Sequence, residues 1–381
     1  MNIGSATVAV ILAAGTSTRM GTPKQLLRLD DRPLLQHVLD NVRASTVAEI
    51  ILVLGAAQEE IQREIDTQDV RVVINQDYAQ GMGSSLKAGL SAVDPQAEAA
   101  FIVLADQPFV RPATLDQLMT EHQRSEGQIV IPTYCGFRGN PVLLDRSVFA
   151  EVMALDGDMG CRAIFGSHVE GIVKVPVDDA GILLDIDQKS DFEALQSTSN
   201  RSAREKALLE TADFQGRQVT DGASAQPELI IVGRDAVAVA LAKLGQLLGF
   251  TVTVVDPLLA ASEFPDADRI LHALDFSALA ANPDRHVVVA SRGACDEEAI
   301  ELALLANSAY VALVAKKKRG EEVLRGLKIK GIAAEKLAGV RVPAGIEIGA
   351  ETPEEIALSI MAQIVSERHQ RRARFEARHH E

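Results

Sequence analysis

The sequence predicts an α/β protein of two domains, the first built on a mixed sheet and the second on a smaller, doubly wound sheet. Its 381 residues exceed what one ordinary core uses. Short apolar runs alternate with helical patterns in both halves, as in sheets whose strands are buried on both faces. Between the halves lies a polar stretch, Gln196–Pro227, which is rich in Ser, Thr, Gln and charge and predicts a linker.

The apolar runs of the first half are four or five residues long, which suits buried strands better than helices. The polar stretch that follows sets the expected boundaries: a first domain over residues 1–197, a linker over 198–226 and a second domain over 227–381. The strands expected in the first domain are Val8–Leu12, Ile50–Leu54, Val70–Ile74, Phe101–Leu104, Gln128–Pro132, Pro141–Leu144 and Val173–Val177.

The second half begins with a strand, a glycine, a helix and a second strand that ends in an acid, which is the Rossmann layout. Its last helix is expected to start at Thr352, because T-P-E-E supplies an N-cap, a proline at N1 and acids in the first turn. The basic tail Arg368–His380 is read as a solvated helix end. The other expected elements are Glu228–Val232, Ala236–Leu248, Thr251–Val255, His286–Ala290, Glu298–Leu305 and Tyr310–Val314.

Composition narrows the class of protein. Apolar residues make up 47% of the chain and charged residues 24%, as in soluble globular proteins. The three cysteines, Cys135, Cys161 and Cys295, show no C-x-x-C spacing, so neither a disulfide framework nor a zinc site is expected and a reducing cytoplasm fits best. The net charge of −15 argues against nucleic acid as a partner, since a polyanion would be repelled.

No apolar stretch reaches the roughly 18 residues that span a bilayer, so no membrane association is expected. The apolar run near the N-terminus has no basic residues ahead of it and continues into a glycine loop. It therefore reads as a first strand and not as a signal peptide.

The segment Leu12–Lys24, LAAGTSTRMGTPK, carries the strongest chemical signal. It follows a strand, at the sheet edge where open α/β folds bind ligands. Its small residues allow backbone N–H groups to approach phosphate oxygens, and two cations, Arg19 and Lys24, follow at short spacing. The G-x-x-x-x-G-K-[ST] order of a P-loop is missing. The residues expected to bind the phosphates are Leu12, Ala13, Ala14, Gly15, Arg19 and Lys24.

This segment resembles the signature of the nucleotidyltransferases that include the molybdenum cofactor guanylyl- and cytidylyltransferases and several sugar-nucleotide pyrophosphorylases. The resemblance implies that Arg19 and Lys24 hold a nucleoside triphosphate. Because the loop reads L-A-A-G, where guanylyl enzymes usually carry L-A-G-G, it is most similar to the cytidylyltransferases. The resemblance covers about residues 5–195.

Two acidic motifs are expected to hold Mg²⁺. L-A-D-Q-P places Asp106 just after an apolar strand, and a carboxylate facing a triphosphate is the hard oxygen ligand that Mg²⁺ prefers. By resemblance Asp106 is the metal-binding aspartate. L-D-I-D-Q-K-S-D resembles the family's D-I-D-T-P-E-D-L stretch, with Asp187 in the position of the second metal ligand and Q-K-S in place of T-P-E.

Two further segments resemble regions that contact the base, the ribose and the acceptor. N-Q-D-Y-A-Q-G-M-G-S-S-L resembles the region that passes the ribose and base; its two glycines are expected to permit a tight turn and its serines to supply hydroxyls. G-N-P-V-L resembles the stretch near the pterin acceptor. The candidate base-side residues are Asn75, Gly81, Gly83, Ser84 and Ser85, and the candidate acceptor residues are Gly139, Asn140 and Pro141.

The second half resembles the C-terminal domain of the xanthine dehydrogenase accessory protein family, through S-R-G-A, Y-V-A-L-V-A-K-K-K-R and V-P-A-G-I-E-I-G-A-E-T-P-E-E-I-A-L-S. Members of that family bind the molybdenum cofactor and pass it to molybdenum hydroxylases. The chain has S-R-G-A and A-K-K-K-R where the family usually shows T-R-G-H and G-S-R-R-K. Candidate cofactor-binding residues are Gly233, Asp256, Arg292 and Lys316.

The two resemblances together imply a fusion that transfers CMP from CTP·Mg²⁺ to Mo-molybdopterin, releases pyrophosphate and hands the product to a hydroxylase of the xanthine dehydrogenase type. Three alternatives stay open. The first is a guanylyltransferase or sugar-phosphate nucleotidyltransferase, and the second is a non-catalytic cofactor chaperone. The third reads the second half as an NAD-dependent oxidoreductase, against which G-R-D-A-V-A departs from the glycine-rich loop.

Overall fold

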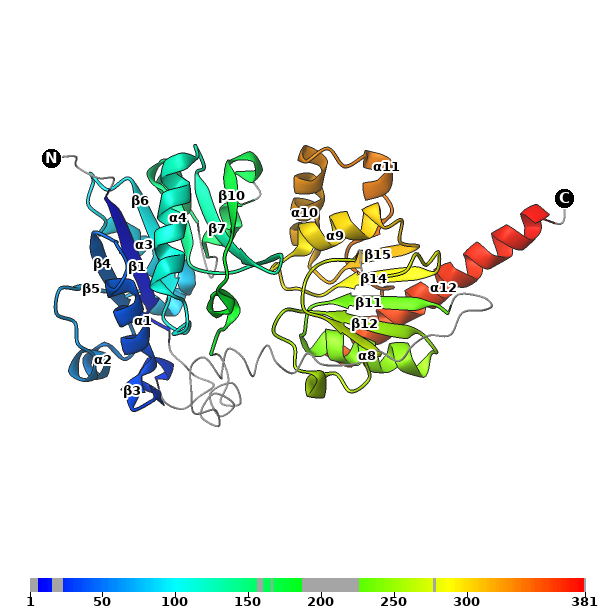
Figure 1. Ribbon diagram of the computed structural model, residues 1–381, viewed down its shortest axis with the longest axis horizontal. Coiled ribbons are helices and arrows are strands. Elements are labelled where there is room, and N and C mark those ends of the chain that lie inside the picture. The colour runs from blue at the N-terminus through cyan, green and yellow to red at the C-terminus, as the bar shows by residue number, and fades with distance from the viewer. Residues whose placement is uncertain are drawn as a thin grey trace. The chain divides into compact units, whose positions relative to one another are not determined.

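The computed structural model describes residues 6–15, 23–155, 160–165, 167–186, 226–276 and 279–379. These residues form two compact units, each with its own sheet and core (Figure 1). The predicted α/β class and two-domain organisation are confirmed. The linker expected over 198–226 lies outside the described residues except for its last residue, Gln226, and Arg19 and Asp187 also lie outside them.

The N-terminal sheet is mixed, as predicted. Its strands run in the order β10-β7-β9-β6-β1-β4-β5, with β8 paired to β7. Only β9 runs antiparallel within this ordered path, to both of its neighbours, β6 and β7. The strands are β1 (Thr7–Ala13), β4 (Glu49–Leu54), β5 (Arg71–Ile74), β6 (Ala99–Leu104), β7 (Ile129–Tyr134), β8 (Phe137–Arg138), β9 (Val142–Asp145) and β10 (Ile172–Pro176), with a separate hairpin of β2 (Arg28–Leu29) and β3 (Arg32–Pro33).

Helices cover both faces of this sheet, which explains why its strands read as continuous apolar runs. One core cluster joins the sheet to α1 (Leu34–Arg43), α2 (Gln58–Glu64) and α4 (Pro112–Arg124). A second cluster, on the other face, joins it to α3 (Met82–Ser91) and α5 (Phe149–Met153). Figure 1 shows α4 and α1 in front of the strands.

The C-terminal sheet is parallel throughout, in the order β13-β12-β11-β14-β15-β16. This is the strand order of the doubly wound dinucleotide-binding fold. Its strands are β11 (Glu228–Val232), β12 (Thr251–Val255), β13 (Arg269–Leu271), β14 (Arg285–Val289), β15 (Tyr310–Leu313) and β16 (Val340–Arg341); its helices are α8 (Ala236–Leu247), α9 (Asp296–Leu305), α10 (Lys317–Ile329), α11 (Ala334–Leu337) and α12 (Pro353–His379).

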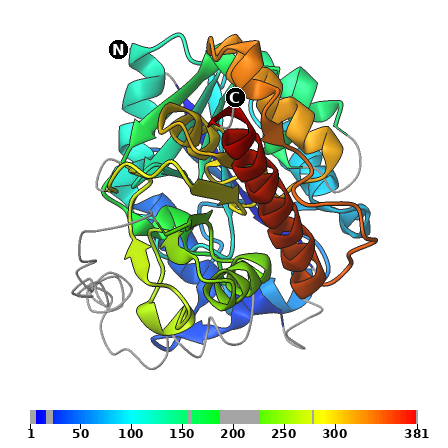
Figure 2. The ribbon, with the colours of Figure 1, turned by 90° about the vertical axis from the view of Figure 1, so that its right-hand side faces the viewer.

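The long helix α12 packs beside α8 on one face of this sheet (Figure 2). Its start is a capping box, because Thr352 Oγ1 accepts from the N–H of Glu355 and Glu355 Oε2 accepts from the N–H of Thr352. The expectation of a solvated basic end is wrong at Arg368. Its Nε donates to Asp284 Oδ2 at 2.6 Å, and its guanidinium lies 5.6 Å from the centre of the Phe250 ring.

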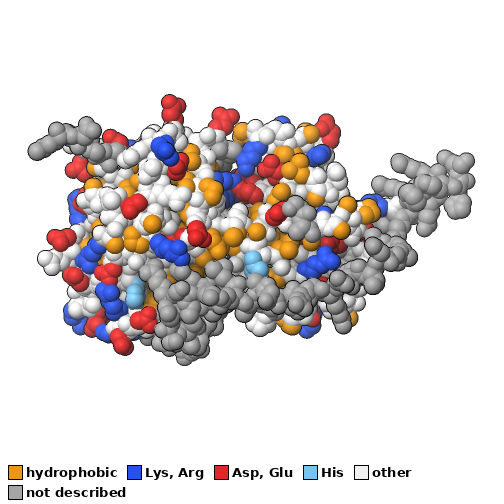
Figure 3. Space-filling model, viewed as in Figure 1, with side chains coloured by type: hydrophobic (Ala, Val, Ile, Leu, Met, Phe, Trp, Pro, Cys, Tyr) orange, Lys and Arg blue, Asp and Glu red, His pale blue; other side chains and the backbone are white. Residues whose placement is uncertain are grey.

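The surface carries both signs of charge in mixture, and Figure 3 shows Lys and Arg interspersed with Asp and Glu on one face. All three cysteines are free thiols. Within the described residues, no helix combines the length and apolar character needed to cross a bilayer.

Candidate nucleotide-binding site

The candidate site lies at the carboxyl ends of β1 and β6, which are adjacent parallel strands. Leu12 pairs with Leu104 at the end of the ladder, and the N–H of Ala105 donates to Leu12 O at 3.3 Å. The loop after β1 and the acid after β6 therefore leave the sheet side by side. Both strands are apolar and buried, so burial of their side chains fixes the position of this edge of the sheet.

Lys24 and Asp106 meet at this edge. Lys24 begins a short 3₁₀ helix (Lys24–Leu26), and its Nζ lies 2.5 Å from Asp106 Oδ2. The side chains are 22% and 16% exposed, so the pair is partly shielded from water but open on one side. The second carboxylate oxygen of Asp106 is buried and has no hydrogen-bond partner among the residues that the structure describes.

That bare oxygen fits a metal ligand. A buried carboxylate oxygen without a donor is costly, and a divalent cation would satisfy it. No group of three or more His, Cys, Asp or Glu side chains in the described part of the chain is placed to hold a metal. Mg²⁺ in nucleotide sites is usually held by one or two carboxylates together with water and phosphate, so one inward carboxylate suits it better than a full protein cage would.

Gln25 fixes the start of the loop after β1, and the sequence did not predict this role. Its side chain is 1% exposed, and Nε2 donates to the carbonyls of Ala13 at 3.0 Å and Gly15 at 3.3 Å. These two bonds hold the carbonyls toward Gln25. A Cβ at Gly15 would meet no atom within 4 Å, so packing does not require glycine there.

A second tie joins the acidic segment 184–186 to the end of β6. The N–H of Ile186 donates to Asp106 O at 3.1 Å, and the buried side chain of Gln107 donates to Asp185 Oδ1 and to Ile182 O. The chain therefore arrives beside Asp106 one residue before Asp187. The position of Asp187 itself lies outside the described residues.

The base-side candidates form a hydrogen-bonded cluster. Asn75 is 5% exposed, and its Nδ2 donates to Ser84 Oγ at 2.9 Å and Ser85 Oγ at 3.0 Å. Gly81 has a φ of 105°, which favours glycine in the turn before α3. The expectation for Gly83 is wrong in one respect: it lies inside the first turn of α3 and not in the preceding turn, because the helix begins at Met82.

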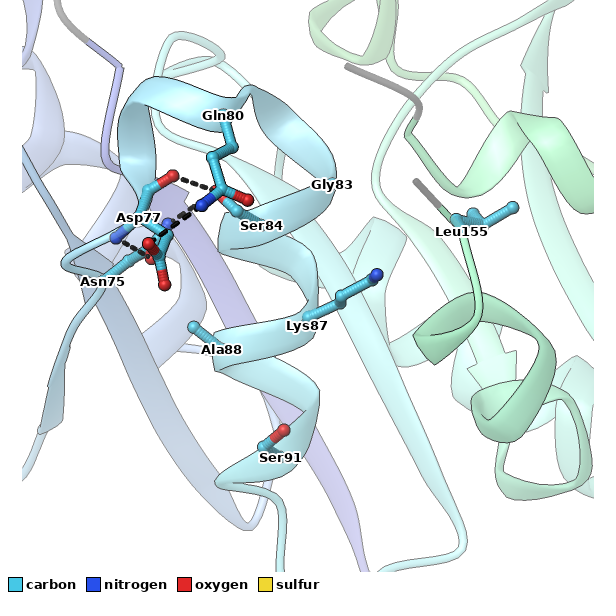
Figure 4. A pocket seen from close by; sticks show the side chains of 9 residues that line it. All are labelled: Asn75, Asp77, Gln80, Gly83, Ser84, Lys87, Ala88, Ser91 and Leu155. Carbon is cyan, nitrogen blue, oxygen red and sulfur yellow. Dashed lines mark hydrogen bonds between the residues drawn. The ribbon is translucent and has the colours of Figure 1, made fainter. Parts of the chain in front are cut away.

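A polar pocket opens beside this cluster (Figure 4). Lys87 extends from α3 toward it, and Asp77 and Gln80 approach from the preceding turn. Gln80 Nε2 donates to Asp77 Oδ1 at 2.9 Å, so part of the lining is held in place. The lining residues are Asn75, Asp77, Gln80, Gly83, Ser84, Lys87, Ala88, Ser91 and Leu155.

The acceptor-side candidates lie where β9 begins, on the other side of β6 from β1. The N–H of Asn140 donates to Ile182 O at 3.0 Å, and a Cβ at Gly139 would lie 2.4 Å from that same oxygen. Glycine is therefore required for this close approach. The Asn140–Pro141 peptide is cis. The structure thus brings the acceptor candidates to the same edge as Asp106.

The second unit places Gly233 and Asp256 together, at the ends of β11 and β12. The N–H of Gly233 donates to Val255 O at 2.9 Å, its φ is 119°, and a Cβ would lie 2.3 Å from Ala290 O. Burial raises the pKa of Asp256, while the Arg234 guanidinium 3.8 Å away acts in the opposite direction. The Asp256 carboxylate is thus paired with the Arg234 guanidinium.

The start of α8 is also occupied, by Asp235. Its Oδ1 accepts from the N–H of Ala238 at 3.0 Å, so a carboxylate caps the helix where a dinucleotide would place its pyrophosphate. Arg292 Nε lies 3.2 Å from Asp235 Oδ2, with its side chain 77% exposed. Lys316 is exposed at the start of α10. Both cations lie after strand ends on one edge of the sheet.

A parallel-sheet edge with a glycine loop, a lysine–aspartate pair and a bare buried carboxylate oxygen defines the class as a nucleotide-binding α/β domain, here followed by a second Rossmann-like domain. Family comparison agrees. Residues 9–172 match the MobA-like NTP transferase domain, and residues 229–364 match the XdhC Rossmann domain. The chain belongs to the MobA-like NTP transferase family, and an XdhC domain follows the transferase domain in the sequence.

Three relatives show how far the likeness reaches. Uncharacterized protein YqeB of Escherichia coli (strain K12) is 32% identical over 205 residues, which is 47% of this chain but only 36% of that protein. Nicotine blue oxidoreductase of Paenarthrobacter nicotinovorans is 30% identical over 40% of this chain and 78% of its own length. Molybdenum cofactor cytidylyltransferase of Escherichia coli (strain K12) is 29% identical over 49% of this chain and 94% of its own length.

Proposed function

We propose that the N-terminal domain is a molybdenum cofactor cytidylyltransferase. It would transfer CMP from CTP to Mo-molybdopterin, with Mg²⁺, and release pyrophosphate. The observation that carries this proposal is the Lys24–Asp106 pair together with the buried, bare second oxygen of Asp106. Family membership supports nucleotidyl transfer, and the relative that carries this activity in its name is matched over 94% of its length.

The chain's own residues would act mainly by charge and alignment. Lys24 leaves Asp106 to bind triphosphate oxygens, and Asp106 with Asp187 would hold Mg²⁺, which neutralises charge on the phosphates when bound. Arg19 would add a second cation from the same loop. The acceptor phosphate is ionised at pH 7, so the reaction needs no general base, and rate enhancement comes from placing the two phosphates in line.

The bond changes are balanced without a further reactant. An oxygen of the acceptor's phosphate attacks the α-phosphorus of CTP and forms a new P–O bond. The bond from the α-phosphorus to the bridging oxygen breaks, and pyrophosphate leaves with that electron pair. The turn Gly139–Pro141 lies beside Asp106 through Ile182 and is proposed to bind the acceptor.

We further propose that the C-terminal domain binds the cofactor and presents it to a molybdenum hydroxylase of the xanthine dehydrogenase type, in the cytoplasm. The match to the XdhC Rossmann domain supports this role. The exposed cations Arg292 and Lys316, which follow β14 and β15, would contact an anionic cofactor. Gly233 and Asp256 follow β11 and β12 at the same edge of the sheet.

An NAD-dependent oxidoreductase is the second candidate, because the second unit has the strand order of dinucleotide-binding folds and one relative is named an oxidoreductase. Two features of the second unit weigh against dinucleotide binding there. Asp235 fills the helix start with negative charge, and Arg234 pairs with the acid that would bind ribose. Oxidation of NADH by the purified chain would favour this candidate.

The deciding experiment measures pyrophosphate release with each nucleoside triphosphate, with and without molybdenum cofactor. Release that requires both CTP and the cofactor supports the proposal. Release with GTP, or with a sugar phosphate as acceptor, moves the chain to another activity of the same family. Tight cofactor binding without release under any combination would identify a non-catalytic chaperone.

A further inference from the structure

Arg138 ends β8, and its charged side chain is buried. It is 6% exposed, and its Nε and Nη2 atoms are buried without an acceptor among the described residues. An arginine side chain stays protonated in proteins, so this charge cannot be removed by titration. Burial removes the hydration of a charge, so buried charges in proteins are usually paired with an opposite charge or bind an ion. The structure therefore points to an anionic ligand.

The position of Arg138 connects it to the transfer site. It directly precedes Gly139 and Asn140, and the N–H of Asn140 donates to Ile182 O. Gln107, the neighbour of Asp106, donates to that same carbonyl oxygen at 3.3 Å. Two hydrogen bonds to one oxygen thus link the turn after Arg138 to the end of β6.

The order of the strands separates Arg138 from the triphosphate cations. Lys24 follows β1, Asp106 follows β6, and Arg138 lies between the end of β7 and the start of β9. Because β9 lies on the side of β6 away from β1, Arg138 and Lys24 flank Asp106. With about 4.8 Å between neighbouring strands, β7 is about 10 Å from β6. An anion at Arg138 would therefore occupy a place distinct from the phosphates at Lys24.

We propose that Arg138 binds the phosphate monoester of the acceptor. This inference rests on the proposed nucleotidyl transfer and assigns the second anionic substrate its own cation. The guanidinium fork matches two oxygens of a phosphate, whereas a triphosphate is already served by Lys24 on the other side of Asp106. Arg138 contacts the acceptor and positions it for attack on the α-phosphorus.

The first test compares Arg138→Met and Arg138→Lys in the full chain by steady-state kinetics. The methionine variant is expected to raise the KM for the acceptor about tenfold to a hundredfold, as the loss of a charged hydrogen bond implies, with the KM for the triphosphate within about twofold of wild type. The lysine variant should fall between, because it keeps the charge but not the fork. Arg124→Met, an exposed arginine on α4, is the matched control. Equal changes in both KM values, or a loss of thermal stability alone, would overturn the proposal.

A second test does not require turnover and uses inorganic phosphate as the probe. Phosphate is expected to raise the Tm of the wild type and of Lys24→Ala, and to raise that of Arg138→Lys less. If no triphosphate supports transfer in the wild type, the proposed function fails, yet this measurement still reports on Arg138. Equal stabilisation of Arg138→Lys and wild type by phosphate would remove Arg138 from anion binding.

Discussion

Lys24 and Asp106 are 82 residues apart in sequence and share one ion pair. In this arrangement each neutralises the other, at the sheet edge where β1 and β6 end. Under the proposed function, binding of a triphosphate and a cation would exchange that internal pair for two ion pairs with the ligands. The two charged side chains that would bind the ligands therefore hold each other in position when no ligand is bound.

Lys24→Ala should leave the fold intact, since the side chain is partly exposed and lies at the sheet edge. Transfer is expected to fall by about two orders of magnitude or more, the scale on which an aligned charge donor contributes. Rates of pyrophosphate release measure this, and Lys243→Ala, an exposed lysine on α8, is the control. Turnover within a few-fold of wild type would take Lys24 out of the mechanism.

Asp106→Asn keeps the shape of the side chain and removes its charge. Activity should collapse, and ordinary Mg²⁺ concentrations should not restore it, because an amide is a weaker ligand for a hard cation. Calorimetric titration of the protein with triphosphate in the presence of Mg²⁺ gives the affinity for the nucleotide–metal complex directly. The exposed Asp178→Asn variant is the control. Unchanged co-binding of nucleotide and metal would exclude Asp106 as a ligand. Asp187→Asn is expected to act in the same direction but more weakly, because its flanking turn departs from the family pattern.

At the scale of elements, a cluster of polar and aromatic side chains joins the start of β14 to α12 in the second unit. His286 on β14 is fully buried, with its ring centre 5.6 Å from that of Phe250, and Arg368 of α12 pairs with Asp284 beside it. Burial lowers the pKa of His286 to about 4; Asp284 and the carbonyl of Glu228 act in the opposite direction, and Arg371 and Arg368 in the same direction.

This pKa predicts a loss of stability in mild acid. The unfolded chain takes up a proton on His286 near pH 6.5, whereas the folded chain does so only near pH 4. The contribution of His286 is therefore fully present above pH 6.5 and is lost as the pH falls toward 4, by about 3 kcal/mol in order of magnitude. Urea unfolding of wild type and His286→Phe across this range measures it. The variant should lack the extra slope, and parallel curves for the two proteins would contradict the assignment.

At the scale of the whole molecule, the phosphate and metal candidates all precede residue 198, and each unit has a core of its own. A chain ending near residue 197 should therefore keep cytidylyl transfer, and one starting near 225 should bind the cofactor without using CTP. A tether between them raises the local concentration of one domain near the other to the order of millimolar.

Splitting the chain should consequently impair delivery to an apo-hydroxylase far more than it impairs transfer. Reconstitution of an apo-hydroxylase by the intact chain and by an equimolar mixture of the halves measures the difference. Equal delivery by the N-terminal half alone would mean that the second domain is not a carrier.

The sequence by itself determined the elements and the place of the loops. Strands buried on both faces appear as apolar runs, so Glu228–Val232 and Thr251–Val255 were predicted to the residue, and the motif at Leu12–Lys24 predicted a loop that follows the strand now seen as β1. The short edge strands Arg269–Leu271 and Val340–Arg341 escaped prediction because they are too short to show a period, and Arg269–Leu271 is only partly buried.

Tertiary structure alone decided which distant groups meet. Nothing in the local pattern shows that Gln25 holds the carbonyls of Ala13 and Gly15, or that Arg138 is buried with its Nε and Nη2 atoms lacking an acceptor among the described residues. Periodicity encodes which face of an element is apolar, and it acts over a few residues. Contacts between groups tens of residues apart depend on strand order and on the course of the loops, which only the folded chain fixes.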